Sequence, residues 1–538
     1  MLAETKYLIE TYGIKTEEWA AELAGQALSL ATFDPCVPME NAPKDATDGA
    51  DFIVNHIPNC LRYNAETSTW YVWNGVIHKP LSGNTVPTQL IDTLGYAFKD
   101  LSNFIESWVR FKANEAKKAK DPEAAQYEKD LKASTTALIA GVKDYARSLN
   151  SNRGVKDTLE KLSRAVAVDA DFFGDDRQWF VVRNGVFDME EVRATKQWTL
   201  KKHEPWRPVY RMWDIADAPG ADYPHLKKFL GESIADDGQA RFFSKAVALA
   251  CMGSPVSTKT LVSLQGETNS GKSMINRVVK RLAKGADTVV APPRDAIVAG
   301  ARKPEHARYK MRRGRYVAFS EIRVALDTEF VLQYTGGDDY DIEEKFIASS
   351  TVAPQGIIFM ASNKGTQVDK TDAAMFSRIA PVNFPHTFVK GIDETENLED
   401  LIVAEGSGFL EWMKWSYLTY LEEGLDKTDS MEALKREERE ADSTALQFVD
   451  AQIEANLLRF QPTLPKSRSI LLTNLHESYV RYCMRHAIQP KDILKKKDFR
   501  KHLEVRYEVD NTAGYRVYGL AHTTPAESMG NFVQTERD

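Results

Sequence analysis

A glycine-rich loop between an apolar segment and a helical pattern constrains the fold most strongly. Residues 260–264 carry no charge and predict a buried strand. The chain continues as Gly266-Glu-Thr-Asn-Ser-Gly-Lys-Ser273, which fits the pattern G-x-x-x-x-G-K-[ST] at every fixed position. Apolar residues then recur at helical spacing from Met274 to Leu282. A strand, a glycine loop and a helix in this order predict a phosphate-binding loop.

The residue types of this loop predict a nucleoside triphosphate site. Glycines let the backbone approach a ligand closely, and the N–H groups of the loop and of the helix N-terminus attract phosphate. Lys272 is expected to reach the β- and γ-phosphates, and the Ser273 hydroxyl to complete a Mg²⁺ shell. An ordinary Gly-rich turn is the alternative, which the flanking strand and helix disfavour. The predicted ATP contacts are Gly266, Asn269, Ser270, Gly271, Lys272 and Ser273.

Composition excludes several classes of protein. The chain of 538 residues is 43% hydrophobic and 27% charged, as in globular proteins with sizeable cores. No window approaches 18 apolar residues, and the N-terminus has neither the basic nor the apolar part of a signal peptide, so we expect a cytoplasmic protein without a membrane span. A net charge of −7 restricts any nucleic-acid site to a local basic patch or an internal channel. The four cysteines are scattered and are expected to be reduced and non-ligating: Cys36, Cys60, Cys251 and Cys483.

Changes in pattern along the chain predict a fold with several parts. Strand and helix patterns alternate from Tyr223 to about residue 425, which is typical of a parallel sheet with crossover helices. The charge-dense segment Met431–Asp442 is expected to be a connecting helix. The expected parts are an N-terminal helix and loop (1–50), an α+β domain (51–222), an α/β nucleotide domain (223–430) and a basic C-terminal domain (445–525).

The C-terminal segment has the pattern of a winged helix. Helices are predicted at Phe448–Leu458, Leu471–His486 and Lys497–Leu503, followed by strands at Val505–Val509 and Tyr515–Leu520. Residues 466–508 hold eleven Lys and Arg against five Asp and Glu, a net charge of +6 in an acidic chain. This excess makes Lys495, Lys496 and Lys497 candidates for contact with DNA phosphates. A solvated helix face is the alternative.

Two features of the α+β domain could contact nucleic acid or could have a purely structural role. Strand-like aromatic segments end in Asn-Gly turns at Asn74–Gly75 and Asn184–Gly185. Trp70, Trp73, Trp179 and Phe180 could stack on bases, but packing in the core is the favoured interpretation. The charge run 113–134 is expected to form a solvated helical hairpin broken at Pro122.

Two further strands of the nucleotide domain end in polar residues suited to hydrolysis. Residues 316–319 predict a buried strand that runs through Ser320 into Glu321, the arrangement of a Walker B acid. A second buried strand, 356–361, ends at Ser362-Asn363. Asn363 could orient the attacking water or sense the γ-phosphate. A strand-end cap is the alternative for Asn363.

The order of these motifs resembles the superfamily 3 helicases, and more narrowly the primase/helicase group of phages, plasmids and poxviruses. Besides the motifs above, the resemblance rests on Thr335-Gly-Gly-Asp338, on Asp372-Ala-Ala-Met-Phe-Ser-Arg378 and on Phe384-Pro385. It implies an ATPase core of the AAA+ type, preceded by a cap domain. It also implies a ring, usually a hexamer, that moves 3′ to 5′ along single-stranded DNA.

The resemblance also implies roles for individual residues. Lys272 and Ser273 correspond to Walker A, Glu321 to Walker B with Mg²⁺, and Asn363 to sensor 1. Arg378 corresponds to the arginine finger, which reaches the γ-phosphate of a neighbouring subunit. A cation there would stabilise charge that develops in the transition state.

The sequence departs from the family pattern at positions that grip DNA. Leu332 and Glu343 stand where the family usually has Lys and Arg. Lys345, Lys364 and Lys370 are the replacements that we consider. The Walker B element has Ser320 beside one acid instead of a pair of acids. Glu321 would therefore serve both Mg²⁺ and the attacking water, or Asp338 would assist it.

The sequence therefore predicts an ATP-dependent replicative helicase that separates fork duplex. The segment before the first Trp-rich strand is too short for a primase domain, so any primase or polymerase would be a separate partner. The family implies a phage or mobile element acting in bacterial cytoplasm. The alternatives are a P-loop kinase or phosphotransferase, or an ATP-driven ring that loads or packages DNA without unwinding.

Overall fold

The computed structural model describes residues 45–523 apart from short internal gaps. The gaps are 57–58, 82, 120–121, 174–177, 254–257, 285–287, 321, 323, 344–349, 364–371, 442, 491–492 and 512–513. The expected N-terminal helix and loop lie almost wholly outside the described residues. The chain divides into two compact units. Unit 1 extends to Gly220 and includes a short segment from Leu282, and unit 2 contains the rest.

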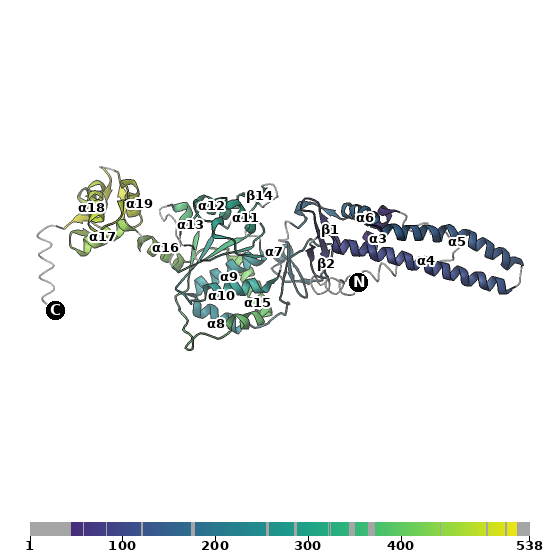
Figure 1. The fold of residues 1–538 in the computed structure, drawn as a ribbon. Coiled ribbons are helices and arrows are strands. Elements are labelled where there is room, and N and C mark those ends of the chain that lie inside the picture. Colours follow the sequence, from purple (N-terminus) through teal and green to yellow (C-terminus); the bar gives the residue numbers. More distant parts are fainter. Residues whose placement is uncertain are drawn as a thin grey trace. The chain divides into compact units, whose positions relative to one another are not determined.

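Unit 1 contains a long antiparallel helical hairpin, visible in purple and blue in Figure 1. Helix α4 ends at Ala119 and α5 begins at Pro122, as the sequence predicts, because proline is tolerated in the first turn of a helix. Ser151 caps the next helix, α6, by accepting a hydrogen bond from the N–H of Gly154. The helices are α3 Ala46–His56, α4 Thr85–Ala119, α5 Pro122–Leu149, α6 Asn152–Ala165 and α7 Met189–Thr195.

Small sheets complete unit 1. Their strand orders are β3-β2-β1-β4, β5-β6-β7 and β10-β8. The strands are β1 Leu61–Asn64, β2 Thr69–Trp73, β3 His78–Leu81, β4 Ala167–Val168, β5 Trp179–Val182, β6 Gly185–Asp188, β7 Leu200–Lys201, β8 Met212–Trp213 and β10 Ala283–Lys284. The second expected turn is shifted, because Gly185 pairs with Val182 within the ladder and Arg183-Asn184 form the turn.

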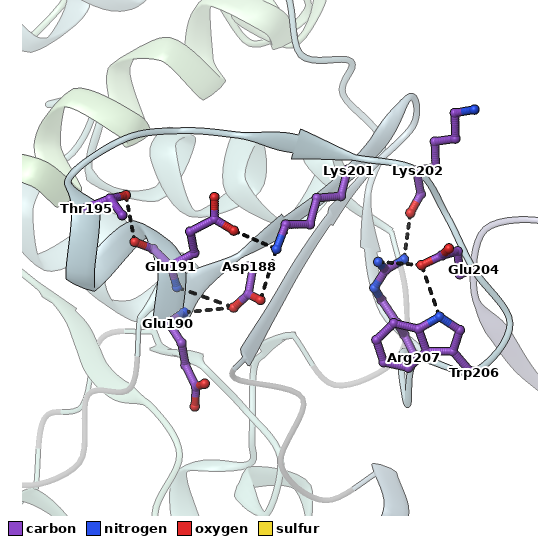
Figure 2. A network of polar contacts seen from close by, with 9 residues as sticks. All are labelled: Asp188, Glu190, Glu191, Thr195, Lys201, Lys202, Glu204, Trp206 and Arg207. Atoms are coloured by element: carbon purple, nitrogen blue, oxygen red, sulfur yellow. Dashed lines mark hydrogen bonds and ion pairs between the residues drawn. The ribbon is translucent and has the colours of Figure 1, made fainter.

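The aromatic residues of these strands pack inside unit 1. Trp70, Trp73, Trp179 and Phe180 are each at most 8% exposed. Arg207 stacks on the ring of Trp179 at 4.9 Å. It also stacks on the ring of Trp206 at 4.6 Å and pairs with Glu204 at 2.6 Å (Figure 2). Core packing is therefore confirmed, since stacking on bases requires an open ring face.

A second group of contacts in Figure 2 fixes α7 to its sheet. Asp188 caps the helix by accepting a hydrogen bond from the N–H of Glu190 at 3.1 Å. The Lys201 ammonium lies 2.6 Å from Glu191 and 3.3 Å from Asp188. These polar side chains are partners of one another, which accounts for the network as part of the fold.

A five-stranded parallel sheet organises unit 2. Its strand order is β11-β12-β15-β9-β16, so the strand before the glycine loop lies between β15 and β16. Every residue of β9 and β15 is buried, as in parallel sheets covered on both faces. The strands are β9 Leu261–Gln265, β11 Val289–Val290, β12 Tyr316–Phe319, β15 Ile357–Ser362 and β16 Ile379–Asn383.

Helices cover both faces of this sheet. On one face, Phe330 and Tyr334 of α12 and Met375 of α13 share a core with alternate strand residues such as Ile358. On the other face, Phe243 of α9 packs on the ring of Phe359. The helices are α8 Pro224–Ser233, α9 Asp237–Met252, α10 Lys272–Leu282, α11 Pro304–Arg308, α12 Thr328–Gly336, α13 Ala373–Arg378, α14 Leu398–Ala404 and α15 Gly406–Glu423.

Helix α16, Asp429–Ala441, lies where a connecting helix is expected, and three helices follow it. They are α17 Thr444–Glu454, α18 Leu472–Arg485 and α19 Lys496–Leu503. The first begins before the expected Phe448 because Ser443 caps it, accepting from the N–H of Leu446 at 3.2 Å. Small sheets with the orders β18-β20-β19 and β17-β21 accompany these helices.

The two strands expected at the C-terminal end are wrong in detail. Most of 505–509 is a turn, because the N–H of Tyr507 bonds to the carbonyl of Leu503 at 2.9 Å, and pairing starts at Val509. Gly519, at φ +76°, divides the second expected strand. The strands are β17 Leu458–Phe460, β18 Ile470–Leu471, β19 Val509–Asp510, β20 Arg516–Val517 and β21 Leu520–His522.

Candidate nucleotide-binding site

The glycine loop follows β9 and ends where α10 begins at Lys272. Gly266 has φ +153°, and a Cβ atom there would lie 2.2 Å from the carbonyl oxygen of Phe384. Gly271 has φ +91°, and its Cβ would lie 2.6 Å from the ring of Phe229. Both positions therefore require glycine, for conformation and for space.

The Lys272 side chain is held within this loop. It is 6% exposed. Its ammonium donates hydrogen bonds to the carbonyl oxygens of Gly266 and Glu267, both at 2.6 Å, and to the hydroxyl of Ser270 at 3.0 Å. A buried ammonium on a glycine loop is placed to exchange carbonyl partners for phosphate oxygens.

The loop lines a cavity of about 1110 Å³ in unit 2. Residues 268–273 form one wall, and Ser320 and Asn363 reach the same cavity from the ends of β12 and β15. The carboxyl ends of neighbouring parallel strands meet at one sheet edge, where ligands bind in open α/β folds. The structure therefore brings Asn363 and the glycine loop together. Glu321 lies outside the described residues, directly after Ser320.

Several residues that line the cavity have no signal in the sequence. Helix α8 contributes His225, Lys228 and Phe229, and the segment after β16 contributes Phe388 and residues from Glu394 to Asp400. The N–H of Phe388 donates to the carbonyl oxygen of Asn269 at 3.0 Å, which ties this segment to the glycine loop. A pattern at helical or strand spacing does not reveal such contacts, because the partners are far apart in the chain.

Ion pairs between α10 and α14 lie at the edge of the cavity. Arg277 contacts Glu399 at 2.7 Å, and Arg281 contacts Asp400 at 2.7 Å and Glu399 at 3.1 Å. Burial acts to raise the pKa of Glu399, but the hydrogen bonds from both arginines hold it below its ordinary value. Glu399 therefore stays ionised and keeps both arginines paired.

Arg378 ends α13 and does not line the cavity. Asp372 caps this helix by accepting from the N–H groups of Ala374 at 3.0 Å and Met375 at 3.1 Å. The Nε and Nη1 atoms of Arg378 are buried and have no hydrogen-bond partner among the described residues. Buried guanidinium donors without a partner are costly, so this side chain is suited to an anion that the described residues do not supply.

The Thr335–Asp338 element forms the end of α12. Gly337 has φ +89°, and the N–H of Asp338 donates to the carbonyl of Gln333 at 3.1 Å, as in a glycine-capped helix terminus. The chain continues into a hairpin of β13 Tyr340–Ile342 and β14 Ser350–Val352. Lys345, in the connection between these strands, lies outside the described residues, as do Lys364 and Lys370.

The three lysines predicted to contact DNA in the C-terminal segment lie at α19. Lys495, Lys496 and Lys497 are exposed at the beginning of α19.

Within the described ranges there is no group of three His, Cys, Asp or Glu side chains that could hold a metal ion. Ser273 lines the cavity, whereas its expected partner Glu321 is not described. Cys60, Cys251 and Cys483 are free, and burial raises the pKa of the Cys60 thiol to about 11.

A family model matches one segment of the chain. Residues 50–234 match the family model "D5 N terminal like". This match supports the resemblance to the primase-helicase group for that segment. No curated protein matches the chain. None of the described helices combines the length and apolar character needed to cross a bilayer.

Solved structures of the C-terminal region of NrS-1 are similar to part of the chain. The A form apo structure is 13% identical and covers 56% of this chain and 78% of that chain, with a TM-score of 0.34. Another apo structure of this region is also 13% identical and covers 57% of this chain and 79% of that chain, with a TM-score of 0.32.

Proposed function

We propose that this protein is an ATP-dependent DNA helicase of the superfamily 3 type, with an AAA+ core that assembles as a ring. The observation that carries the proposal is the convergence of the glycine loop, Ser320 and Asn363 on one cavity. Strand β15 lies between β9 and β12, so Asn363 extends from the strand between the glycine loop and the predicted acid. Hydrolysis needs a water-orienting group between the phosphates and a carboxylate, which this order supplies.

The residues of the proposed site would have distinct tasks, and Glu321 would have two of them. Lys272 would balance the charge of the β- and γ-phosphates, and Ser273 and Glu321 would hold Mg²⁺. Bound Mg²⁺ would neutralise charge that develops during phosphoryl transfer. Glu321 would accept the proton of the attacking water, which Asn363 would orient. Arg378 would act on a nucleotide bound by a neighbouring subunit, because it does not line its own cavity.

DNA would pass through the ring along the β13–β14 hairpin. Lys345 at its connection and Lys364 after β15 are the proposed contacts with single-stranded DNA. The family match over 50–234 supports a role in replication, with any primase or polymerase on a separate chain. A hexamer in bacterial cytoplasm is the expected setting.

Steady-state ATP hydrolysis by the purified chain, with and without single-stranded DNA, tests this proposal. We expect DNA to stimulate hydrolysis, because translocation couples the two. Unwinding of a forked duplex is the second measurement. Hydrolysis that ignores DNA, together with phosphate transfer to a small acceptor, would instead favour the P-loop kinase. Hydrolysis without strand separation would favour a ring for loading or packaging.

The C-terminal segment of 445–525 is proposed to be a winged helix that engages duplex DNA. Helices α18 and α19 with the β18-β20-β19 sheet have the order of that fold. Lys495, Lys496 and Lys497 stand at the positive end of the α19 dipole, where cations are unfavourable. A phosphate ligand would offset this cost.

Replacing all three lysines with glutamine is expected to weaken duplex binding at every sequence. Each lost phosphate contact should reduce the slope of log K against log salt by about 0.9. Fluorescence anisotropy over a salt series measures this slope. Lys466→Gln is the matched control, because Lys466 is paired with Glu508 at 3.5 Å. An unchanged slope in the triple variant would show that the lysines are only a solvated helix face.

A further inference from the structure

A group of cations surrounds the end of α13, beyond the nucleotide cavity. Helix α16 packs against this region and places Lys435 5.1 Å and Arg439 5.5 Å from the ring centre of Phe376. Lys427, just before α16, donates a hydrogen bond from Nζ to the carbonyl oxygen of Ser377 at 2.6 Å. Arg378 follows directly. Four basic side chains from two segments therefore meet at one helix end.

Carboxylates lie close to two of these cations. Glu432 is committed to Lys435, whose Nζ lies 3.1 Å from it, and Lys435 is only 4% exposed. The carboxylates of Asp426 and Glu432 act to raise the pKa of Lys427, whereas the cations Lys435 and Arg378 act to lower it. Burial lowers the pKa of Lys427 first, and the nearby cations lower it further. Several cations gathered at one helix end create a positive potential that attracts an anion.

The anion cannot be the phosphate chain of a nucleotide in the same subunit. Arg378 precedes β16, whereas the far end of that strand, Asn383, pairs with Gln265 next to the glycine loop. A strand rises about 3.3 Å per residue, so the five steps from Arg378 to Asn383 separate these two residues by ~16 Å. An arginine side chain does not span that distance, and neither Arg378 nor Lys427 lines the cavity.

We propose that Lys427 joins Arg378 in a two-cation site for the terminal phosphates of a nucleotide held by a second copy of this chain. This inference rests on the proposed function and adds a residue to it. The Arg378 guanidinium has two buried donor atoms without a partner among the described residues, and Lys427 supplies a second charge next to it. The Ser377 carbonyl accepts a hydrogen bond from the Lys427 ammonium and so fixes its position. Two fixed cations would stabilise the triphosphate more in the transition state than in the ground state.

Mixed assemblies of two inactive variants test where Lys427 acts. Lys427→Gln is expected to lower kcat by about 100-fold, because one charge-stabilising group is lost, with ATP binding unchanged. Lys272→Ala lacks a working nucleotide site but keeps Lys427 and Arg378. In a 1:1 mixture, about one interface in four joins an intact site to an intact cation pair. Activity should therefore return, to about a quarter of the wild-type rate if the interfaces act independently and to less than that in a coupled ring.

Three controls make the result decisive. Arg436→Gln removes one charge from an exposed position of α16 and should leave the rate unchanged. Lys427→Arg should retain much of the activity, because the charge is kept. The mixture of Arg378→Ala with Lys272→Ala should recover in the same way as the Lys427→Gln mixture.

Other outcomes identify what is wrong. If the Arg378→Ala mixture recovers and the Lys427→Gln mixture does not, Lys427 acts within its own subunit and the inference fails. If Lys427→Gln hydrolyses ATP normally but binds single-stranded DNA more weakly, the anion is a nucleic-acid phosphate. If the wild-type chain hydrolyses no ATP, the proposed function itself fails, before any variant is compared.

Discussion

Arg378→Ala is expected to lower kcat for ATP hydrolysis by about 1000-fold, the smaller end of the effect of an arginine finger. Affinity for ATP should stay close to that of the wild type, because Arg378 does not line its own cavity. The substitution should raise the free energy of the transition state, where charge develops on the transferred phosphoryl group, and leave that of bound ATP unchanged. Steady-state hydrolysis and equilibrium binding of ATP, measured on the same protein, separate the two quantities.

Titrating Arg378→Ala into wild-type protein provides the control for action between subunits. In a ring, each variant subunit disables the site of its neighbour, and a coupled ring loses more activity than the fraction of variant added. Arg378→Lys is the matched substitution: it keeps the charge but loses the planar donor geometry, so it should recover only part of the rate. An Arg378→Ala protein that hydrolyses ATP at the wild-type rate, with no loss of activity in the titration, would contradict a finger shared between subunits.

The nucleotide loop could be predicted from the sequence because its chemistry is local. Gly266 and Gly271 have positive φ values that belong to the loop itself, although the atoms that leave no room for a Cβ come from the distant residues Phe384 and Phe229. Asn363 was predictable for a related reason: a buried strand that ends in a polar residue places that residue at the ligand edge of a parallel sheet. Both inferences need only one segment and a general rule about sheets.

The rest of the site depends on contacts between distant segments. Phe388 binds the backbone of Asn269, and Arg277 pairs with Glu399, across more than a hundred residues in each case. Lys427 meets Ser377 across 50 residues. The spacing of residues along the chain does not predict these contacts, because each residue also fits the pattern of an ordinary helix or of a solvated surface. Strand ends in the C-terminal segment were missed for the opposite reason: Gly519 and the turn at Tyr507 override local strand propensity.

Lys272→Ala is expected to abolish both hydrolysis and the stabilisation that ATP gives to the fold. The substitution removes the buried ammonium that donates to Gly266, Glu267 and Ser270, so two loop carbonyls lose a donor. It also removes the charge that faces the β- and γ-phosphates. Hydrolysis should fall at least about 100-fold, as for the loss of a transition-state donor.

Thermal unfolding with and without ATP and Mg²⁺ separates this effect from that of Arg378→Ala. A ligand at 100 times its Kd stabilises the folded state by about 2.7 kcal/mol. Wild type and Arg378→Ala should therefore melt at a higher temperature with nucleotide, and Lys272→Ala should not. Lys280→Ala, at an exposed position of the same helix, should behave as the wild type. A Lys272→Ala protein that kept the ATP-dependent shift would place the nucleotide outside this cavity. One that lost the shift yet still supported DNA replication would instead show that the ring works without hydrolysis.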